Sequence, residues 1–235
     1  MRITTEALVL KTLPHSDSRD VGVLYSRGQG RFSVLMPAAG KRRRRPAPLT
    51  VIEGNVSFSS TSSMHKLYAY ETAEPFSGIS LSPLKSAQAL FIADFLDRLL
   101  AESPGEPLLW DHIVSRLRHF SAMKRGAADF SILFLLSLLP FAGITPITDN
   151  YSPGSFFDLR AGTYTSFRPT HNDVLEGTEA GMPRILSRLN SRTAPIVCRS
   201  GKRRMEIIEG ILRYYRIHFP TVAKVRAHLI LSQLF

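Results

Sequence analysis

The first eighty residues are organised as short runs in which apolar and polar side chains partly alternate. This period of two is typical of strands with one buried face, and tight polar turns separate the runs, including Arg27–Gly30. The expected strands are 6–13, 20–26, 31–36, 49–58 and 66–70. A small open sheet of this kind would leave unpaired edges, so the pattern predicts a closed five-stranded barrel.

The spacing of apolar residues changes to three or four from Ser82 onward. Ser82 and Pro83 form a helix start, with an N-capping hydroxyl followed by proline in the first turn. Three helices are expected: one from Pro83 that ends before Ser103-Pro104-Gly105, one at 107–123 and one at 127–141. The third is apolar on nearly all sides, which predicts burial in a three-helix bundle over about 82–143.

Residues 145–182 are rich in Gly, Pro, Ser, Thr and Asn, and within them 155–167 predicts a small hairpin. Three further helices are expected at 183–190, 202–218 and 221–234. The sequence therefore predicts an α+β protein. A five-stranded barrel at 1–80 is followed by an all-α domain at 81–235, which carries the inserted hairpin and ends in basic helices at 183–235.

Charge is distributed unevenly along this framework. The net charge is +11, and it divides into +5 for residues 1–80, −3 for 81–181 and +9 for 182–235. A basic protein of this kind usually meets a polyanion, most often nucleic acid, whereas uniform surface charge would serve only solubility. The two basic ends favour a docking surface for nucleic acid.

Catalytic and metal-binding signatures are missing from the sequence. Gly201-Lys202 lacks the remaining residues of a phosphate-binding loop, and the histidines have no paired ligand spacing. Cys198 is the only cysteine, so a zinc site built from cysteines and an intramolecular disulfide are both excluded. We therefore expect neither an enzyme nor a bound cofactor, zinc included. The N-terminus has no apolar signal core, and the longest apolar run, 132–139, is too short to span a bilayer, so a cytoplasmic protein is expected.

Two basic clusters are the candidates for contact with a nucleic acid backbone. Lys41–Arg45 lies between Gly40 and Pro46, and five adjacent cations cannot pack in a core. Arginine matches phosphate geometry, although a merely solvated loop is the alternative. The second cluster opens the helix at 202–218, where exposed helix charge explains it equally well. The expected contacts are Lys11, Arg19, Arg27, Arg31, Lys41, Arg42, Arg43, Arg44, Arg45, Arg199, Lys202, Arg203 and Arg204.

Several segments, in this order along the chain, resemble the RecO family. Ala7–Thr12, Asp17–Asp20 and Arg27-x-x-Gly30-Arg31, followed by the basic run after Gly40, are similar to its N-terminal barrel. Phe156–Gly162 resembles its short hairpin, and Ile211–Pro220 is similar to its last helices. The resemblance implies that the barrel is an oligonucleotide-binding (OB) fold. It further implies strand annealing without a cofactor, in recombinational DNA repair.

The resemblance also implies partners: RecR, the acidic C-terminal tail of the single-strand-binding protein and, downstream, RecA. An acidic tail with an apolar end needs a hydrophobic slot rimmed by cations, and the expected site comprises Arg116, Phe120, Lys124 and Arg125. The alternative is that Lys124 and Arg125 only complement the negative end of their helix. Some relatives carry a four-cysteine zinc module near the hairpin, and here packing must replace it.

The resulting hypothesis is a DNA-binding recombination mediator that is cytoplasmic and associated with the nucleoid. It would anneal complementary strands and help load recombinase on single-stranded DNA coated by single-strand-binding protein. One alternative is an RNA-binding barrel protein of translation or RNA processing, which shares the charge. Another is a hydrolase or nuclease with an unrecognised site.

Overall fold

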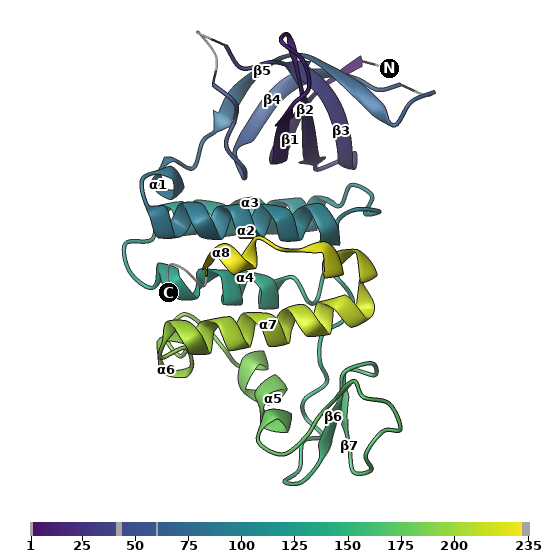
Figure 1. Ribbon diagram of the computed structural model, residues 1–235, viewed down its shortest axis with the longest axis vertical. Coiled ribbons are helices and arrows are strands. Elements are labelled where there is room, and N and C mark those ends of the chain that lie inside the picture. Colours follow the sequence, from purple (N-terminus) through teal and green to yellow (C-terminus); the bar gives the residue numbers. More distant parts are fainter. Residues whose placement is uncertain (1, 41–43, 60, 232–235) are drawn as a thin grey trace. The chain divides into compact units, whose positions relative to one another are not determined.

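The five strands of the N-terminal region pair in the order β1-β2-β3-β5-β4, and β4 pairs with β1, so that the sheet closes on itself (Figure 1). This computed structural model describes residues 2–40, 44–59 and 61–231. The strands are β1 (Arg2–Pro14), β2 (Arg19–Ser26), β3 (Gly30–Pro37), β4 (Val51–Ser57) and β5 (Met64–Glu74). All pairs are antiparallel except β3 with β5, which is parallel.

Alternation of side chains accounts for the barrel interior. Every second residue of β3 is buried, including Phe32, Val34 and Met36, and these side chains meet apolar ones from the other four strands. Gly30, at the turn between β2 and β3, has a φ of 66°. A side chain would be strained there, and a Cβ would lie 2.3 Å from the carbonyl oxygen of Ser103. This glycine therefore allows the turn to approach the segment after the first long helix.

Helices α1 (Ser77–Ser80), α2 (Pro83–Leu99) and α3 (Pro107–Ala122) follow the barrel. The Ser82 hydroxyl accepts a hydrogen bond from the backbone N–H of Lys85, which caps α2 as the sequence predicts. Helix α3 buries the stripe Leu109, Ile113, Leu117 and Phe120. The starts of both long helices are therefore where proline and the capping residue place them.

The helix expected at 221–234 is wrong as a single element over 221–231, and 232–234 lie outside the described residues. The chain forms a short 3-10 helix, η3 (Pro220–Lys224), and then α8 (His228–Leu231). The backbone N–H groups of Arg226 and Ala227 donate to the Asp94 carboxylate, at 3.0 and 3.2 Å, instead of to carbonyls one turn earlier. A distant carboxylate thus interrupts the helix and caps a new one against α2.

The helix expected at 127–141 is also shorter in the structure. It begins as a 3-10 turn, η1 (Ala127–Asp129), continues as α4 (Phe130–Ser137) and then changes to tighter turns. The N–H groups of Leu138 and Leu139 bond to carbonyls three residues earlier, and Pro140 has no N–H to continue the ladder. The expected burial is present, since Phe130, Ile132, Phe134 and Leu135 are at most 1% exposed.

The inserted hairpin is present as β6 (Phe156–Asp158) and β7 (Thr163–Thr165), and β8 (Val174–Leu175) adds a third strand. Its core is aromatic. The Phe157 ring lies 4.9 Å from that of Tyr164 and 6.4 Å from that of Tyr214. The Tyr164 hydroxyl donates to Ala180 and the Tyr214 hydroxyl to Ile144. Packing and buried hydrogen bonds therefore hold this segment together.

The remaining elements are η2 (Glu179–Gly181), α5 (Met182–Ser187), α6 (Ala194–Val197) and α7 (Gly201–His218). An α+β fold with a five-stranded sheet and helices is thus confirmed. The sequence suggested a division at residue 80, between strands and helices. The contacts within the chain instead define two compact units. The first unit ends at Ala127 and also includes a later segment that begins at Lys224, and the second unit is Ala128–Ala223. No helix among the described residues is long and apolar enough to cross a membrane.

Candidate nucleic-acid interface

Of the predicted contact residues in the barrel unit, Lys11, Arg19 and Arg44 are exposed and belong to no ion pair with a described residue. Lys11 lies on β1, Arg19 begins β2, and Arg44 follows β3. Lys41, Arg42 and Arg43 lie outside the described residues. The β1–β2 hairpin carries Lys11 and Arg19, because Lys11 pairs with Val23 and Pro14 with Asp20 in its ladder. These exposed side chains are available to phosphate.

Arg45 has a different position from the rest of its run. Its guanidinium donates twice to the Asp20 carboxylate, at 2.8 and 3.1 Å, and Asp20 is only 1% exposed. The backbone N–H of Ala39 donates to the same carboxylate. Because Arg45 hydrogen bonds to it, the pKa of Asp20 lies below its usual value. Arg45 therefore anchors the end of the basic run next to Arg19.

Arg27 and Arg31 are also engaged with acids of the same unit. Arg31 on β3 contacts Asp97 of α2 at 2.7 Å, and the Asp97 side chain is 6% exposed. Arg27 contacts Asp111 of α3 at 2.8 Å, with both side chains more than half exposed. Arg31 thus ties the barrel to α2, whereas Arg27 retains open guanidinium surface.

The second basic cluster lies at the start of α7 and comprises Arg199 and Lys202–Arg204. Like the cations of the barrel unit, some of its members form ion pairs and others do not. The Ser200 hydroxyl accepts from the N–H of Arg203 and caps the helix. Arg204 contacts Asp129 at 2.7 Å, with side chains 19% and 4% exposed, and Arg203 contacts Glu206 at 3.0 Å. Arg199 and Lys202 are exposed and lie outside the ion pairs of the described residues.

The carboxylates that engage these arginines were not identified from the sequence. As whole residues, Asp20, Asp97 and Asp129 are at most 5% exposed, and each holds one arginine of the expected interface. The available signal was an acidic residue within an otherwise apolar strand or helix pattern. Such a residue needs a cation when it is buried, and arginines that are distant in sequence provide it.

The expected slot on α3 for an acidic tail needs correction. Phe120 and Leu117 are fully buried, because both belong to the apolar stripe that α3 turns to the core. Lys124 and Arg125 are exposed, and Arg116 is half-buried with its pKa lowered by burial. The cations are therefore accessible, but Phe120 cannot supply the apolar contact in this structure.

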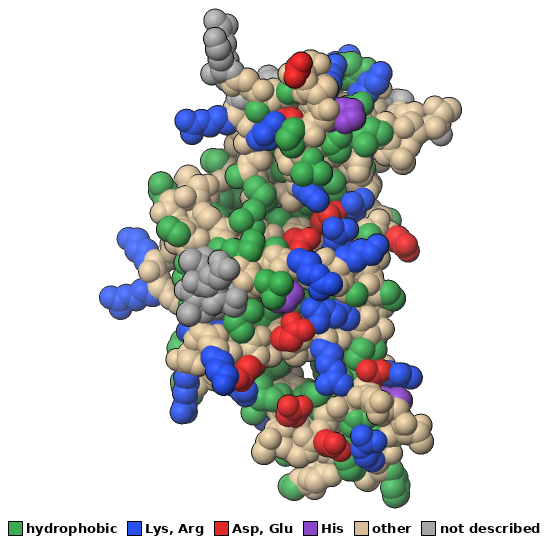
Figure 2. Space-filling view, viewed as in Figure 1, with side chains coloured by type: hydrophobic (Ala, Val, Ile, Leu, Met, Phe, Trp, Pro, Cys, Tyr) green, Lys and Arg blue, Asp and Glu red, His purple; other side chains and the backbone are tan. Residues whose placement is uncertain are grey.

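The remaining ionisable side chains of the described residues form no metal-binding group. Within each unit, the face drawn in Figure 2 shows Lys and Arg side chains beside acidic ones. No three of the His, Cys, Asp and Glu side chains in the described ranges are grouped so that they could hold a metal ion. Burial raises the pKa of the Cys198 thiol to about 11, so this cysteine stays protonated.

Comparison with known proteins identifies the class. No family model matches the chain. Curated relatives do: a protein of Bacteroides fragilis is 30% identical, and one of Phocaeicola vulgatus is 28% identical, with 98% of each chain covered in both cases. A protein of Azobacteroides pseudotrichonymphae is 22% identical over the full length of both chains.

All three relatives carry the name DNA repair protein RecO. The class of protein is therefore that of DNA repair proteins. The chain belongs to the RecO family.

Proposed function

We propose that this protein is a DNA-binding recombination mediator that anneals complementary strands and has no catalytic activity of its own. Membership of a DNA repair family over nearly the full chain carries the proposal. The closed five-stranded barrel supports its assignment as an OB fold, a class that binds single strands along one face and its loops. The exposed Lys11, Arg19 and Arg44 supply sequence-independent contacts to phosphate.

The mechanism is electrostatic. Two single strands repel each other through their phosphates, and cations on one surface reduce that repulsion and release condensed counterions. Complementary bases can then pair without an energy source. Arg199 and Lys202 extend the set of exposed cations to the second unit.

The partners belong to the same proposal: RecR, the acidic tail of the single-strand-binding protein, and RecA, which is loaded afterwards. For the tail, exposed Lys124 and Arg125 offer charge, and an apolar contact must come from residues other than Phe120. A tail peptide titrated against Arg116→Ala/Lys124→Ala and against Arg199→Ala/Lys202→Ala separates the two candidate surfaces. The variant with the weaker affinity identifies the site.

An annealing assay tests the central activity. Two complementary labelled single strands are mixed with the protein, with and without bound single-strand-binding protein. We expect faster duplex formation in both cases and no cleavage in the presence of Mg²⁺. Unchanged annealing rates would contradict the proposal. Preference for RNA over DNA of the same sequence in competition would favour an RNA-binding function.

A further inference from the structure

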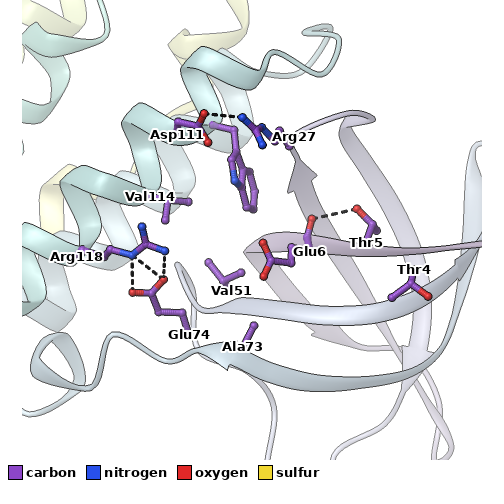
Figure 3. A pocket seen from close by; sticks show the side chains of 11 residues that line it. Thr4, Thr5, Glu6, Arg27, Val51, Ala73, Glu74, Asp111, Val114 and Arg118 are labelled. Carbon is purple, nitrogen blue, oxygen red and sulfur yellow. Dashed lines mark hydrogen bonds and ion pairs between the residues drawn. The ribbon is translucent and has the colours of Figure 1, made fainter.

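A cavity of about 680 Å³ lies between the outer face of the barrel and α3, within the first unit (Figure 3). Val51 and Val114 give it an apolar floor, since they are 3% and 6% exposed. Two ion pairs stand at its rim: Arg27 with Asp111, and Arg118 with Glu74 (Figure 3). Both arginines are therefore neutralised by acids of the same rim.

The cavity has an unused hydrogen-bond donor. Trp110 lines it and is 6% exposed, with its ring 6.1 Å from that of Tyr25. Its indole N–H donates to no atom of the described residues. This nitrogen is not one of the fully buried polar atoms that lack a partner, so solvent can reach it. A buried tryptophan usually finds an acceptor. Here the acceptor has to come from water or from a ligand, such as a peptide carbonyl.

Glu6, at the edge of the cavity, begins a row of glutamates across three strands. Glu6 of β1 pairs directly with Glu53 of β4, and Glu53 pairs directly with Glu71 of β5. All three are exposed, and none belongs to an ion pair with a described residue. Neighbouring strands are about 4.8 Å apart, so the row is roughly 10 Å long.

This glutamate row, Glu6–Glu53–Glu71, is unfavourable for the isolated fold. Like charges directly opposite on neighbouring strands destabilise a sheet. The chain has a net charge of +11, yet no lysine or arginine of the described residues forms an ion pair with these three, although Arg118 attracts Glu6 from beyond ion-pair distance. The row would also repel the phosphates of DNA, so it does not serve the nucleic acid surface.

We propose that the glutamate row and the adjoining cavity form a docking site for a basic segment of a partner protein. A lysine or arginine of the partner enters the cavity, its aliphatic stem lies against Val51 and Val114, and its cationic head meets Glu6. A backbone carbonyl of the segment accepts from the Trp110 indole. Further basic side chains of the segment pair with Glu53 and Glu71. Charge complementarity selects this occupant over DNA or an acidic peptide.

The experiment uses the only tryptophan of the chain, Trp110, as the reporter. The probes are two capped peptides, Arg-Gly-Arg-Gly-Arg and Glu-Gly-Glu-Gly-Glu, titrated into the full-length protein. We expect the arginine peptide to change the Trp110 emission and the glutamate peptide to leave it unchanged. Binding without an emission change, or no binding of the arginine peptide, would overturn the proposal.

A matched pair of variants tests the row itself. Glu6→Gln/Glu53→Gln/Glu71→Gln should lower the affinity for the arginine peptide by about tenfold or more, since one exposed ion pair contributes up to roughly fivefold. Glu102→Gln/Glu176→Gln/Glu179→Gln makes the same charge change at exposed sites elsewhere, and should stay within about twofold of wild type. Equal losses of peptide affinity in the two variants would show that only the overall charge of the protein matters, and this result would overturn the proposed site.

Stability and self-association complete the test. Removing the repulsion within the row should raise the melting temperature by about 1–3 °C, so weaker binding cannot be ascribed to unfolding. Binding of single-stranded DNA should not weaken in the row variant, which keeps this test independent of the proposed annealing function. If wild type forms a dimer in sedimentation that the row variant does not, the occupant is a second copy of this chain, and the proposal of a different partner fails.

Discussion

The two basic clusters of this protein look alike in sequence and differ in what their arginines do. At the end of the first run, Arg45 holds the buried Asp20 while its own side chain stays 43% exposed. In the second, Arg204 is 19% exposed and holds Asp129, which is 4% exposed. The first arginine can anchor the chain and still face a ligand, whereas the second is committed to the fold. A run of arginines therefore mixes contact residues with structural ones, and the exposure of each arginine side chain in the folded chain separates them.

The largest effect is expected at Arg204. Arg204→Ala leaves the Asp129 carboxylate buried without its cation, and breaking a buried pair in this way costs about 3–5 kcal/mol. Urea unfolding followed by circular dichroism measures the loss of stability. Arg203→Ala, whose partner Glu206 is 47% exposed, is the matched control and should change stability by less than about 1 kcal/mol. Similar losses in both variants would contradict the distinction between structural and exposed arginines.

A smaller, pH-dependent effect is expected at Asp20. Its pKa is lower in the folded state than in the unfolded chain because Arg45 donates to the carboxylate. The ionised form therefore stabilises the fold above the unfolded pKa of about 3.8, and this contribution disappears as pH falls through the folded pKa.

Asp20→Asn should accordingly destabilise the protein at neutral pH, and the difference from wild type should shrink as pH falls below about 3.8. Urea midpoints measured between about pH 7 and pH 3 provide the check. Asp17→Asn, an exposed acid in the same turn, is the control. A difference from wild type that does not vary with pH would show that the Arg45 pair does not set the stability of this turn.

The third effect concerns DNA affinity in the barrel. Lys11→Ala/Arg19→Ala/Arg44→Ala should weaken binding to all single strands alike. The slope of log affinity against log salt should fall by about 0.7 for each phosphate that the variant no longer binds. Thermal stability should change little, because these side chains are exposed. Arg45→Ala is a useful contrast. It should lower the free energy of unfolding as well as the affinity for DNA, because Arg45 also holds the buried Asp20 carboxylate. An unchanged salt slope in the triple variant would mean that these cations are merely solvated.

The smallest effect is expected at the start of α7. Arg199→Ala/Lys202→Ala should reduce the salt slope by less than the barrel variant, because it removes two exposed cations instead of three. Stability should stay within about 0.5 kcal/mol of wild type. Fluorescence anisotropy with a labelled oligonucleotide over a salt series measures both variants. A larger reduction of the salt slope in this variant than in the barrel variant would show that the cations of α7 contact more phosphates than those of the barrel.

The sequence alone determined the class of fold and most of its elements. The period of two placed β1 to β5, and Ser82 with the two prolines placed the starts of α2 and α3, because these signals act between near neighbours. The order of the matching segments along the chain, from the first strands to the last helices, was enough to indicate the family.

Tertiary structure decided whatever depended on residues distant in sequence. The Asp94 carboxylate divided the expected last helix, Asp97 and Asp129 withdrew Arg31 and Arg204 from the candidate interface, and Asp20 anchored Arg45 while leaving it exposed. Phe120 was a candidate contact until the packing of α3 buried it. The glutamate row exists only because strand register places residues 6, 53 and 71 side by side. Long-range contacts of this kind leave no periodic trace in a sequence, so their energies become visible only when the chain is folded.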